Sequence, residues 1–155
     1  MRRAYLSLGS NLGDRARHLA SGVQIAAGTD PCRRSLVYQT EPIGAVVQDD
    51  FWNLVIELTT DATARQLLGR CRAAEAASGR IREQRWGPRT LDVDVVYLEG
   101  ERSDDPEVLV PHPRLYERAF VLVPWHELAP DLVGSDEVAR GLGRVVALGT
   151  LESLR

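Results

Sequence analysis

The alternation of apolar and polar residues along the chain predicts four strands within the first hundred positions. The clearest case is residues 51–60, where Leu54 would lie on one face and Asn53 on the other. Such a pattern is typical of a strand that buries at least one face. On the same grounds we expect strands at residues 3–9, 34–40, 51–60 and 91–98.

Apolar residues at helical spacing predict two helices between these strands. The first would run from the capping residue Asp14 to about Ala27. The second would begin at Asp61 or Thr63 and end just before Gly79. The resulting order is strand, helix, strand, strand, helix, strand. This order is that of the split β-α-β arrangement in ferredoxin-like α+β domains.

The last part of the chain, residues 111–155, looks like an addition to this arrangement. Helices are expected at residues 120–128 and 138–148, the second weakened by two glycines. We therefore expect a single α+β domain over residues 1–155. It would consist of a ferredoxin-like sheet with helices packed on it and a helical C-terminal addition.

The charged residues narrow the possible functions. The chain has 155 residues and a net charge of -3, which gives no support to general nucleic-acid binding. All 19 basic residues are arginine. This excludes a phosphate-binding loop of the Walker A type, which needs a lysine, and it excludes Schiff-base chemistry on lysine. Any phosphate would have to be bound by arginine, whose planar guanidinium makes bidentate contacts.

The sequence also predicts a cytoplasmic protein that does not enter a membrane. Its apolar runs are too short to span a bilayer, and its first residues lead into a strand pattern without a secretory segment. Cys32 and Cys71 lack the spacing of a metal site, so we expect free thiols in a reducing compartment. Nothing in the sequence requires more than a monomer.

Asp92 and Asp94 form the first half of a candidate catalytic site. On a strand, residues i and i+2 point to the same face, about 6.5–7 Å apart along the chain. Two carboxylates on one face repel each other unless a cation joins them, and a pair of Mg²⁺ ions can bridge them to the phosphates of ATP. The alternative is two solvated acids. The apolar neighbours Leu91 and Val95 disfavour it, because they predict a central strand.

An arginine-rich segment directly before this strand forms the second half. Residues 80–89 contain four arginines and one glutamate, a local charge of +3 in an acidic protein. A solvated charge run is the usual interpretation, but this segment adjoins the two aspartates and contains Trp86. Arginines and metal ions are the recurring parts of phosphoryl transfer. Together, the two halves predict a magnesium-dependent enzyme that moves phosphate from ATP to a small organic molecule.

Residues 85–94 read RWGPRTLDVD, which resembles the signature R-W-G-P-R-T-[LI]-D-[LV]-D of the 6-hydroxymethyl-7,8-dihydropterin pyrophosphokinases of folate biosynthesis. The resemblance covers most of the chain, because residues 9–13, 38–44, 51–53 and 110–113 also match that family. It implies a single pyrophosphokinase domain. In the implied reaction, the hydroxymethyl oxygen of the pterin attacks the β-phosphorus of ATP, and AMP leaves.

The resemblance also implies roles at the ATP site. Asp92 and Asp94 would hold two Mg²⁺ ions along the triphosphate. Arg80 and Arg89 would be catalytic and would neutralise the transferring group. The ATP contacts would come from Arg82, Arg85, Trp86, His112 and Arg118. The proton acceptor stays open between Asp94, a water molecule and a bound metal ion.

A pterin is a flat heterocycle that needs aromatic faces and fixed polar groups at its edge. The resemblance places Phe51 and Phe120 on the two faces, although each alone would more often be a core residue. Asn53 would lie at the edge, and a buried amide in an apolar strand needs hydrogen-bond partners. The implied pterin site comprises Thr40, Pro42, Ile43, Phe51, Asn53, Trp86 and Phe120.

Two features depart from the pattern of the family. Glu107 and Leu109 stand where some members carry an arginine and a threonine near the nucleotide. The loop between Arg82 and Trp86 is one residue shorter than in some members. The contacts around these positions would therefore differ from those of such members.

Two other interpretations remain open. A two-metal nucleotidyltransferase also uses paired aspartates, but its Gly-Ser turn lies close before them, whereas Ser10 is about eighty residues away from Asp92. A non-catalytic ferredoxin-like binding module would need neither the acidic pair nor the arginines. An RNA-binding version would also need a basic surface, which the net charge does not support.

Overall fold

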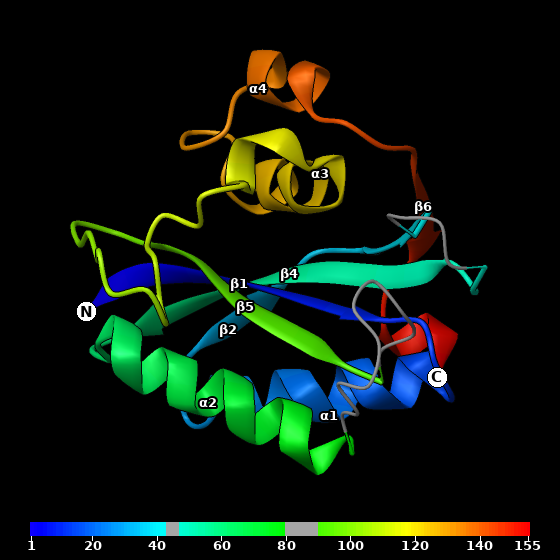
Figure 1. The fold of residues 1–155 in the computed structure, drawn as a ribbon, viewed down its shortest axis with the longest axis horizontal. Helices are drawn as coiled ribbons and strands as arrows, with labels where there is room; N and C mark the ends of the chain where they lie inside the picture. Colours follow the sequence, from blue (N-terminus) through cyan, green and yellow to red (C-terminus); the bar gives the residue numbers. More distant parts are fainter. Residues whose placement is uncertain (43–46, 80–89) are drawn as a thin grey trace.

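The computed structural model describes residues 1–42, 47–79 and 90–155 and shows a six-stranded antiparallel sheet with helices on both faces (Figure 1). The strand order is β5-β1-β4-β3-β6, and β2 pairs with β4 beside this path. The strands are β1 (Arg2–Ser10), β2 (Cys32–Arg34), β3 (Val37–Thr40), β4 (Phe51–Thr60), β5 (Asp92–Leu98) and β6 (Val145–Gly149). The helices are α1 (Arg15–Ala27), α2 (Ala64–Ala77), α3 (Ala119–Leu128) and α4 (Ser135–Arg140), with short 3-10 helices η1 (Leu115–Glu117) and η2 (Glu152–Leu154).

The predicted ferredoxin-like arrangement is confirmed. β1 lies between β4 and β5 and is antiparallel to both, and α1 and α2 cover the same face of the sheet (Figure 1). One expectation about this sheet is wrong, because β5 is an edge strand and not a central one. Val93 and Val95 of this strand are apolar because α2 packs on the face that carries them, which buries an edge strand as well as a central one.

Local capping explains where the first two helices begin. The Asp14 side chain accepts a hydrogen bond from Arg17 N at 3.2 Å, as predicted. For α2 the cap is Thr63, whose Oγ1 accepts from Gln66 N at 3.1 Å while Gln66 Oε1 accepts from Thr63 N at 2.9 Å. This capping box identifies Thr63, not Asp61, as the start of the helix.

The predicted strand at residues 34–40 is interrupted. Ser35 N donates to Val55 O at 2.9 Å, and Ser35 Oγ accepts from Val55 N at 3.0 Å. The next amide, Leu36 N, donates to the Glu127 carboxylate of α3 at 3.1 Å. β2 therefore ends at Arg34, and β3 starts at Val37, because side chains replace the backbone ladder between them.

The predicted helix at residues 138–148 is wrong. The chain forms the short helix α4 and then the strand β6, which pairs antiparallel with β3. Gly143 lies between them with a φ of 110°, a conformation that breaks a helix and that glycine adopts readily. The α-helices of the addition are therefore α3 and α4, and β6 extends the sheet.

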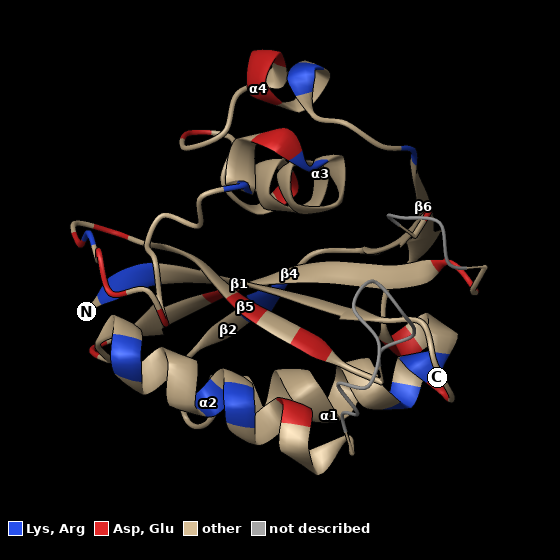
Figure 2. Ribbon diagram, viewed as in Figure 1, with Lys and Arg blue, Asp and Glu red and all other residues tan. Residues whose placement is uncertain are grey.

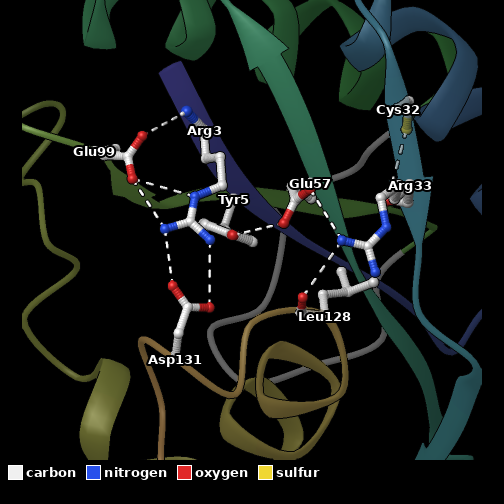
Figure 3. A network of polar contacts seen from close by, with 8 residues as sticks. All are labelled: Arg3, Tyr5, Cys32, Arg33, Glu57, Glu99, Leu128 and Asp131. Atoms are coloured by element: carbon white, nitrogen blue, oxygen red, sulfur yellow. Dashed lines mark hydrogen bonds and ion pairs between the residues drawn. The ribbon is translucent and has the colours of Figure 1, made fainter.

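Hydrophobic cores lie on both faces of the sheet. The larger core joins the sheet to α1 and α2, and the smaller one lies beneath α3 around Tyr5, Val55 and Trp125. Polar contacts also fasten the end of α3 to the sheet (Figure 3). Tyr5 Oη donates to Glu57 Oε2 at 2.6 Å, and Arg33 donates to Glu57 Oε1 at 3.2 Å and to the last carbonyl of α3 at 3.5 Å. α3 is therefore held firmly over one half of the sheet.

Among the helices of the described part of the chain, none is both long enough and apolar enough to cross a membrane.

Candidate active site

Asp92 and Asp94 lie on one face of β5, as predicted. Val93 and Val95 are buried on the opposite face, against α1 and α2. Asp92 is partly buried and Asp94 is exposed. Figure 2 shows acidic positions along β5 where the strand passes beneath α3. The two carboxylates therefore face the α3 side of the sheet, where the space for a ligand would lie.

The backbone between the two aspartates is held by a residue of α2. Val93 N donates to Glu75 Oε2 at 3.1 Å, and Glu75 is buried. Because β5 is an edge strand, this carboxylate supplies a partner that a further strand would otherwise supply.

The strand register places the acidic pair beside the predicted pterin residues. In β1, Gly9 lies opposite Asp92 of β5 on one side and opposite Asn53 of β4 on the other. Residues directly opposite each other in a sheet point to the same face. Asp92 and Asn53 therefore share one face, separated only by a glycine without a side chain.

Asn53 and Thr40 form the polar part of the predicted pterin site. Both are buried, and Asn53 Nδ2 donates to Thr40 Oγ1 at 2.6 Å. This bond fixes the amide, so that its oxygen and its second N–H are held in place. The prediction that Asn53 needs a polar partner is confirmed.

The predicted aromatic residues lie on two different elements. Phe51 begins β4 on the same face as Asn53, and its ring lies close to Gly9. Phe120 is in the first turn of α3, with the Arg118 guanidinium 5.6 Å from the centre of its ring. Pro42 is half-buried and lies two residues beyond the end of β3.

His112 and Arg118 lie together with Asp94, as the resemblance implied. Ser7, Asp94, His112, Arg118 and Phe120 line one small cavity under the start of α3. Burial lowers the pKa of His112, and the nearby positive charge of Arg118 lowers it further. A neutral imidazole at this position can accept or donate a hydrogen bond without adding charge.

The same cavity contains two residues that the sequence did not single out. Arg114 lines it beside Arg118, and its positive charge, after burial, lowers the pKa of Arg118. Ser7 lies opposite Asp94 across β1 and β5. Because two guanidinium groups repel each other, their shared position suits an anion. The only signal for Arg114 in the sequence is its position two residues after His112.

A second, larger cavity adjoins the first. It has a volume of about 270 Å³ and shares Asp94 and His112 with the small cavity. Its other walls are Leu68 of α2, Val93 and Val95 of β5, Pro113, and residues 106–109. The lining is largely apolar, with charged groups at its edge, which suits a nucleoside that carries phosphates.

The segment before β4 is tied to the end of β1. Asn11 Nδ2 donates to Gln48 Oε1 and to Asp49 O, both at 2.8 Å. Arg15 donates to Asp50 O at 3.0 Å, and its guanidinium lies 4.4 Å from the centre of the Trp52 ring. Asn11 and Arg15 thus help to position the strand that carries Phe51 and Asn53.

Several predicted site residues lie outside the described residues. They are Ile43 of the pterin site and Arg80, Arg82, Arg85, Trp86 and Arg89 of the arginine-rich segment. The structure describes the other predicted site residues. The roles of all the predicted site residues stay predictions.

Asp92 and Asp94 suit a magnesium ion that water and substrate also bind better than a metal ion whose ligands all come from the protein. Within residues 1–42, 47–79 and 90–155 there is no cluster of three or more His, Cys, Asp or Glu side chains that could hold a metal. Mg²⁺ usually keeps several waters and binds through one or two carboxylates together with substrate phosphates. Asp92 and Asp94 supply that donor set, beside cavities that suit a phosphate-bearing ligand.

Comparison with known proteins agrees with this geometry. Residues 5–130 match the family described as 7,8-dihydro-6-hydroxymethylpterin-pyrophosphokinase (HPPK). A protein of Methylorubrum extorquens named 2-amino-4-hydroxy-6-hydroxymethyldihydropteridine pyrophosphokinase is 48% identical over 143 residues, which cover 90% of each chain. Proteins of the same name are 40% identical in Bacillus subtilis, over 81% of this chain and 77% of the relative, and 40% identical in Mycobacterium bovis, over 84% and 74%. The chain belongs to the 7,8-dihydro-6-hydroxymethylpterin-pyrophosphokinase family.

Proposed function

We propose that this chain transfers the diphosphate of ATP to 6-hydroxymethyl-7,8-dihydropterin in folate biosynthesis, giving the pterin diphosphate and AMP. Family membership and the names of the homologues support this reaction. In the structure, the observation that supports the reaction most directly is the register of three strands, in which Gly9 of β1 lies between Asp92 of β5 and Asn53 of β4. The amide proposed to bind the pterin and a carboxylate proposed to hold the Mg²⁺ of ATP are thereby adjacent.

The pterin would lie on the α3 face of β4. Its polar edge would bind the Asn53 amide, which Thr40 holds in place, and its flat faces would contact Phe51 and Phe120. Ile43 and Trp86 would complete this site. A ring held in this way has its hydroxymethyl group fixed in direction, which lowers the entropic cost of reaching the transition state.

ATP would place its base in the larger cavity, with its phosphates extending past Asp94 and His112 at the border of that cavity. His112 borders both cavities and would contact the nucleotide, while Arg118 and Arg114 would face the phosphates. Arg80, Arg82, Arg85 and Arg89 would add further positive charge. Positive groups fixed in advance stabilise the charge that develops on a transferring phosphate.

Asp92 and Asp94 would hold Mg²⁺, in two ions along the triphosphate. Metal ions at this position would neutralise the charge of the phosphates and hold them in line for attack. In the reaction, the hydroxymethyl oxygen forms a bond to the β-phosphorus, and the bond from that phosphorus to the oxygen of the α-phosphate breaks. The hydroxyl proton must leave as the new bond forms, and its acceptor stays open between the exposed Asp94, a water molecule and a bound metal ion.

We also propose that the enzyme acts as a monomer in the cytoplasm. Cys32 and Cys71 are free thiols, as in a reducing compartment.

Product analysis tests the proposed function. The protein is mixed with ATP, Mg²⁺ and 6-hydroxymethyl-7,8-dihydropterin, and AMP is separated from ADP. AMP together with a diphosphorylated pterin is the expected result. ADP would show an ordinary kinase, and a folded protein without nucleotide turnover would favour a binding module.

A further inference from the structure

The outer wall of the larger cavity is a short loop that the core anchors only in part. Residues 106–109 line the cavity opposite β5. Val108 is buried in the core, whereas Glu107 and Leu109 are exposed. The position of the exposed part of this wall must therefore depend on contacts other than hydrophobic burial.

The loop is closed by its own backbone. Ser103 and Val110 form a two-way bridge, with N–O distances of 3.0 and 3.1 Å. Inside it, Asp105 Oδ1 accepts from Glu107 N at 3.0 Å, and Asp105 O accepts from Val108 N at 3.0 Å. A loop bonded internally in this way moves as a unit, so a contact at one of its residues positions the whole wall.

Two arginines of α2 make contacts of that kind. Arg65, Leu68 and Arg72 are spaced three and four residues apart, which puts them on one side of the helix. Leu68 lines the cavity, while Arg65 pairs with Asp105 and Arg72 pairs with Glu107 at 2.9 Å. The two ion pairs therefore fasten the loop to α2 on either side of the residue that forms the cavity floor.

Charge gives Arg72 a second effect. Glu107 lines a cavity that, under the proposed function, receives ATP, and its carboxylate would repel the phosphates. Arg72 holds a positive charge 2.9 Å from that carboxylate. The pair presents almost no net charge to the nucleotide, which an unpaired glutamate could not do.

We propose that Arg65 and Arg72 are positioning residues for ATP, because their ion pairs with Asp105 and Glu107 hold the outer wall of the nucleotide cavity against α2. This inference rests on the proposed function, since it takes the cavity to be the nucleotide site. Neither arginine needs to touch the nucleotide.

A charge swap at residues 72 and 107 tests the inference. The variants are Arg72→Glu, Glu107→Arg and the double variant, and the dissociation constant is measured for a non-hydrolysable ATP analogue with Mg²⁺. Exposed ion pairs contribute modestly. We therefore expect Arg72→Glu, which breaks the pair and leaves two negative charges at the wall, to raise the dissociation constant about 2- to 5-fold, and the double variant to return within about 2-fold of the wild type. The turnover rate at saturating ATP should stay unchanged in all three.

A second ion pair of similar geometry serves as the matched control. Arg34 and Glu152 lie 2.7 Å apart and are about as exposed, but they do not line this cavity. The same swap there should leave ATP binding unchanged. Thermal unfolding of every variant shows that the fold is kept.

The outcomes separate the inference from the proposed function. Equal dissociation constants in all variants, with a wild type that binds, would overturn the inference alone. Tighter binding by Glu107→Arg, kept in the double variant, would overturn it too, because residue 107 would then act directly on the phosphates. A wild type that binds no ATP would contradict the proposed function itself, and the inference with it.

Discussion

Gly9 leaves the space that the Asn53 side chain occupies, because a β-carbon on Gly9 would lie 2.3 Å from Asn53 Oδ1. Non-bonded atoms do not approach so closely without displacement of one of them. The amide that Thr40 holds in place is therefore available only because β1 carries a glycine at this point. The same glycine, on β1, lies between Asp92 of β5 and Asn53 of β4, so no side chain separates these two residues.

Changing Gly9 to Ala should weaken pterin binding. The new methyl group would push the Asn53 amide out of place, and we expect the dissociation constant for the pterin to rise at least about tenfold, with a loss of about 1–3 kcal/mol in the free energy of unfolding from overpacking. Calorimetric titration and urea unfolding measure the two effects. Gly69→Ala in α2 is the control, because a β-carbon there meets no atom within 4 Å. Unchanged pterin binding in Gly9→Ala would show that Asn53 does not contact the pterin.

Changing Asp92 or Asp94 to Asn should abolish AMP formation and leave the fold intact. Asparagine keeps the size of the side chain but removes the negative charge that would bind Mg²⁺. For the exposed Asp94, we expect the free energy of unfolding to change by no more than about 0.5 kcal/mol. Activity assays and thermal melting of the same samples check this. Unfolding of both variants would indicate that the pair has a structural role instead.

His112 should titrate below its ordinary value of 6.5 in the protein without ligands, because burial and the charges of Arg118 and Arg114 lower its pKa. As the pH falls below 6.5, the unfolded chain then takes up this proton before the folded chain does. The free energy of unfolding should therefore fall with pH in that window. Addition of an ATP analogue should raise the pKa of His112, since phosphates favour the cation.

Proton NMR of the imidazole signals follows this titration, and the signal that is absent from His112→Gln identifies the residue. A pKa at or above 6.5 without ligand, or no change on adding the analogue, would contradict this account of the cavity.

Changing Tyr5 to Phe should destabilise the fold without lowering the turnover rate. The substitution removes the 2.6 Å hydrogen bond to Glu57 and leaves a buried carboxylate with one partner fewer. A hydrogen bond to a charged group contributes about 1.5–3 kcal/mol, so we expect a loss of that size in urea unfolding. The double variant Tyr5→Phe/Glu57→Gln should lose less than the sum of the two single changes. A strict sum would mean that the two side chains do not interact in solution.

The sequence predicted β1, β4 and β5 because of the pattern of apolar and polar residues in each, and α1 and α2 because apolar residues recur at helical spacing after the capping residues Asp14 and Thr63. Two features of the sheet could not be predicted from such patterns. The run of apolar residues at 145–149 is short enough to fit either a helix or a strand, and only its pairing with β3 decides between them. The apolar residues of β5 could not show an edge strand, because α2 covers the face that carries Val93 and Val95.

The candidate site, too, could be predicted from the sequence only in part. Asp92 and Asp94 could be identified because the spacing of two residues on a strand determines their common face. The need for a glycine at position 9 could not be identified from the sequence. The atom that a β-carbon there would clash with belongs to Asn53, which lies on another strand, β4. Arg114 was missed for a similar reason, since its place beside Arg118 and Asp94 results from tertiary packing.

The fate of each phosphorus atom of ATP tests the central claim most directly. ATP labelled separately at the α-, β- or γ-phosphorus is incubated with Mg²⁺, the pterin and the protein, and the label is located in the separated products. Diphosphate transfer predicts the α-label in AMP and both the β- and γ-labels on the pterin. A γ-label alone on the pterin would indicate an ordinary kinase, and an α-label on the pterin would indicate a nucleotidyltransferase, so either result would contradict the proposed reaction.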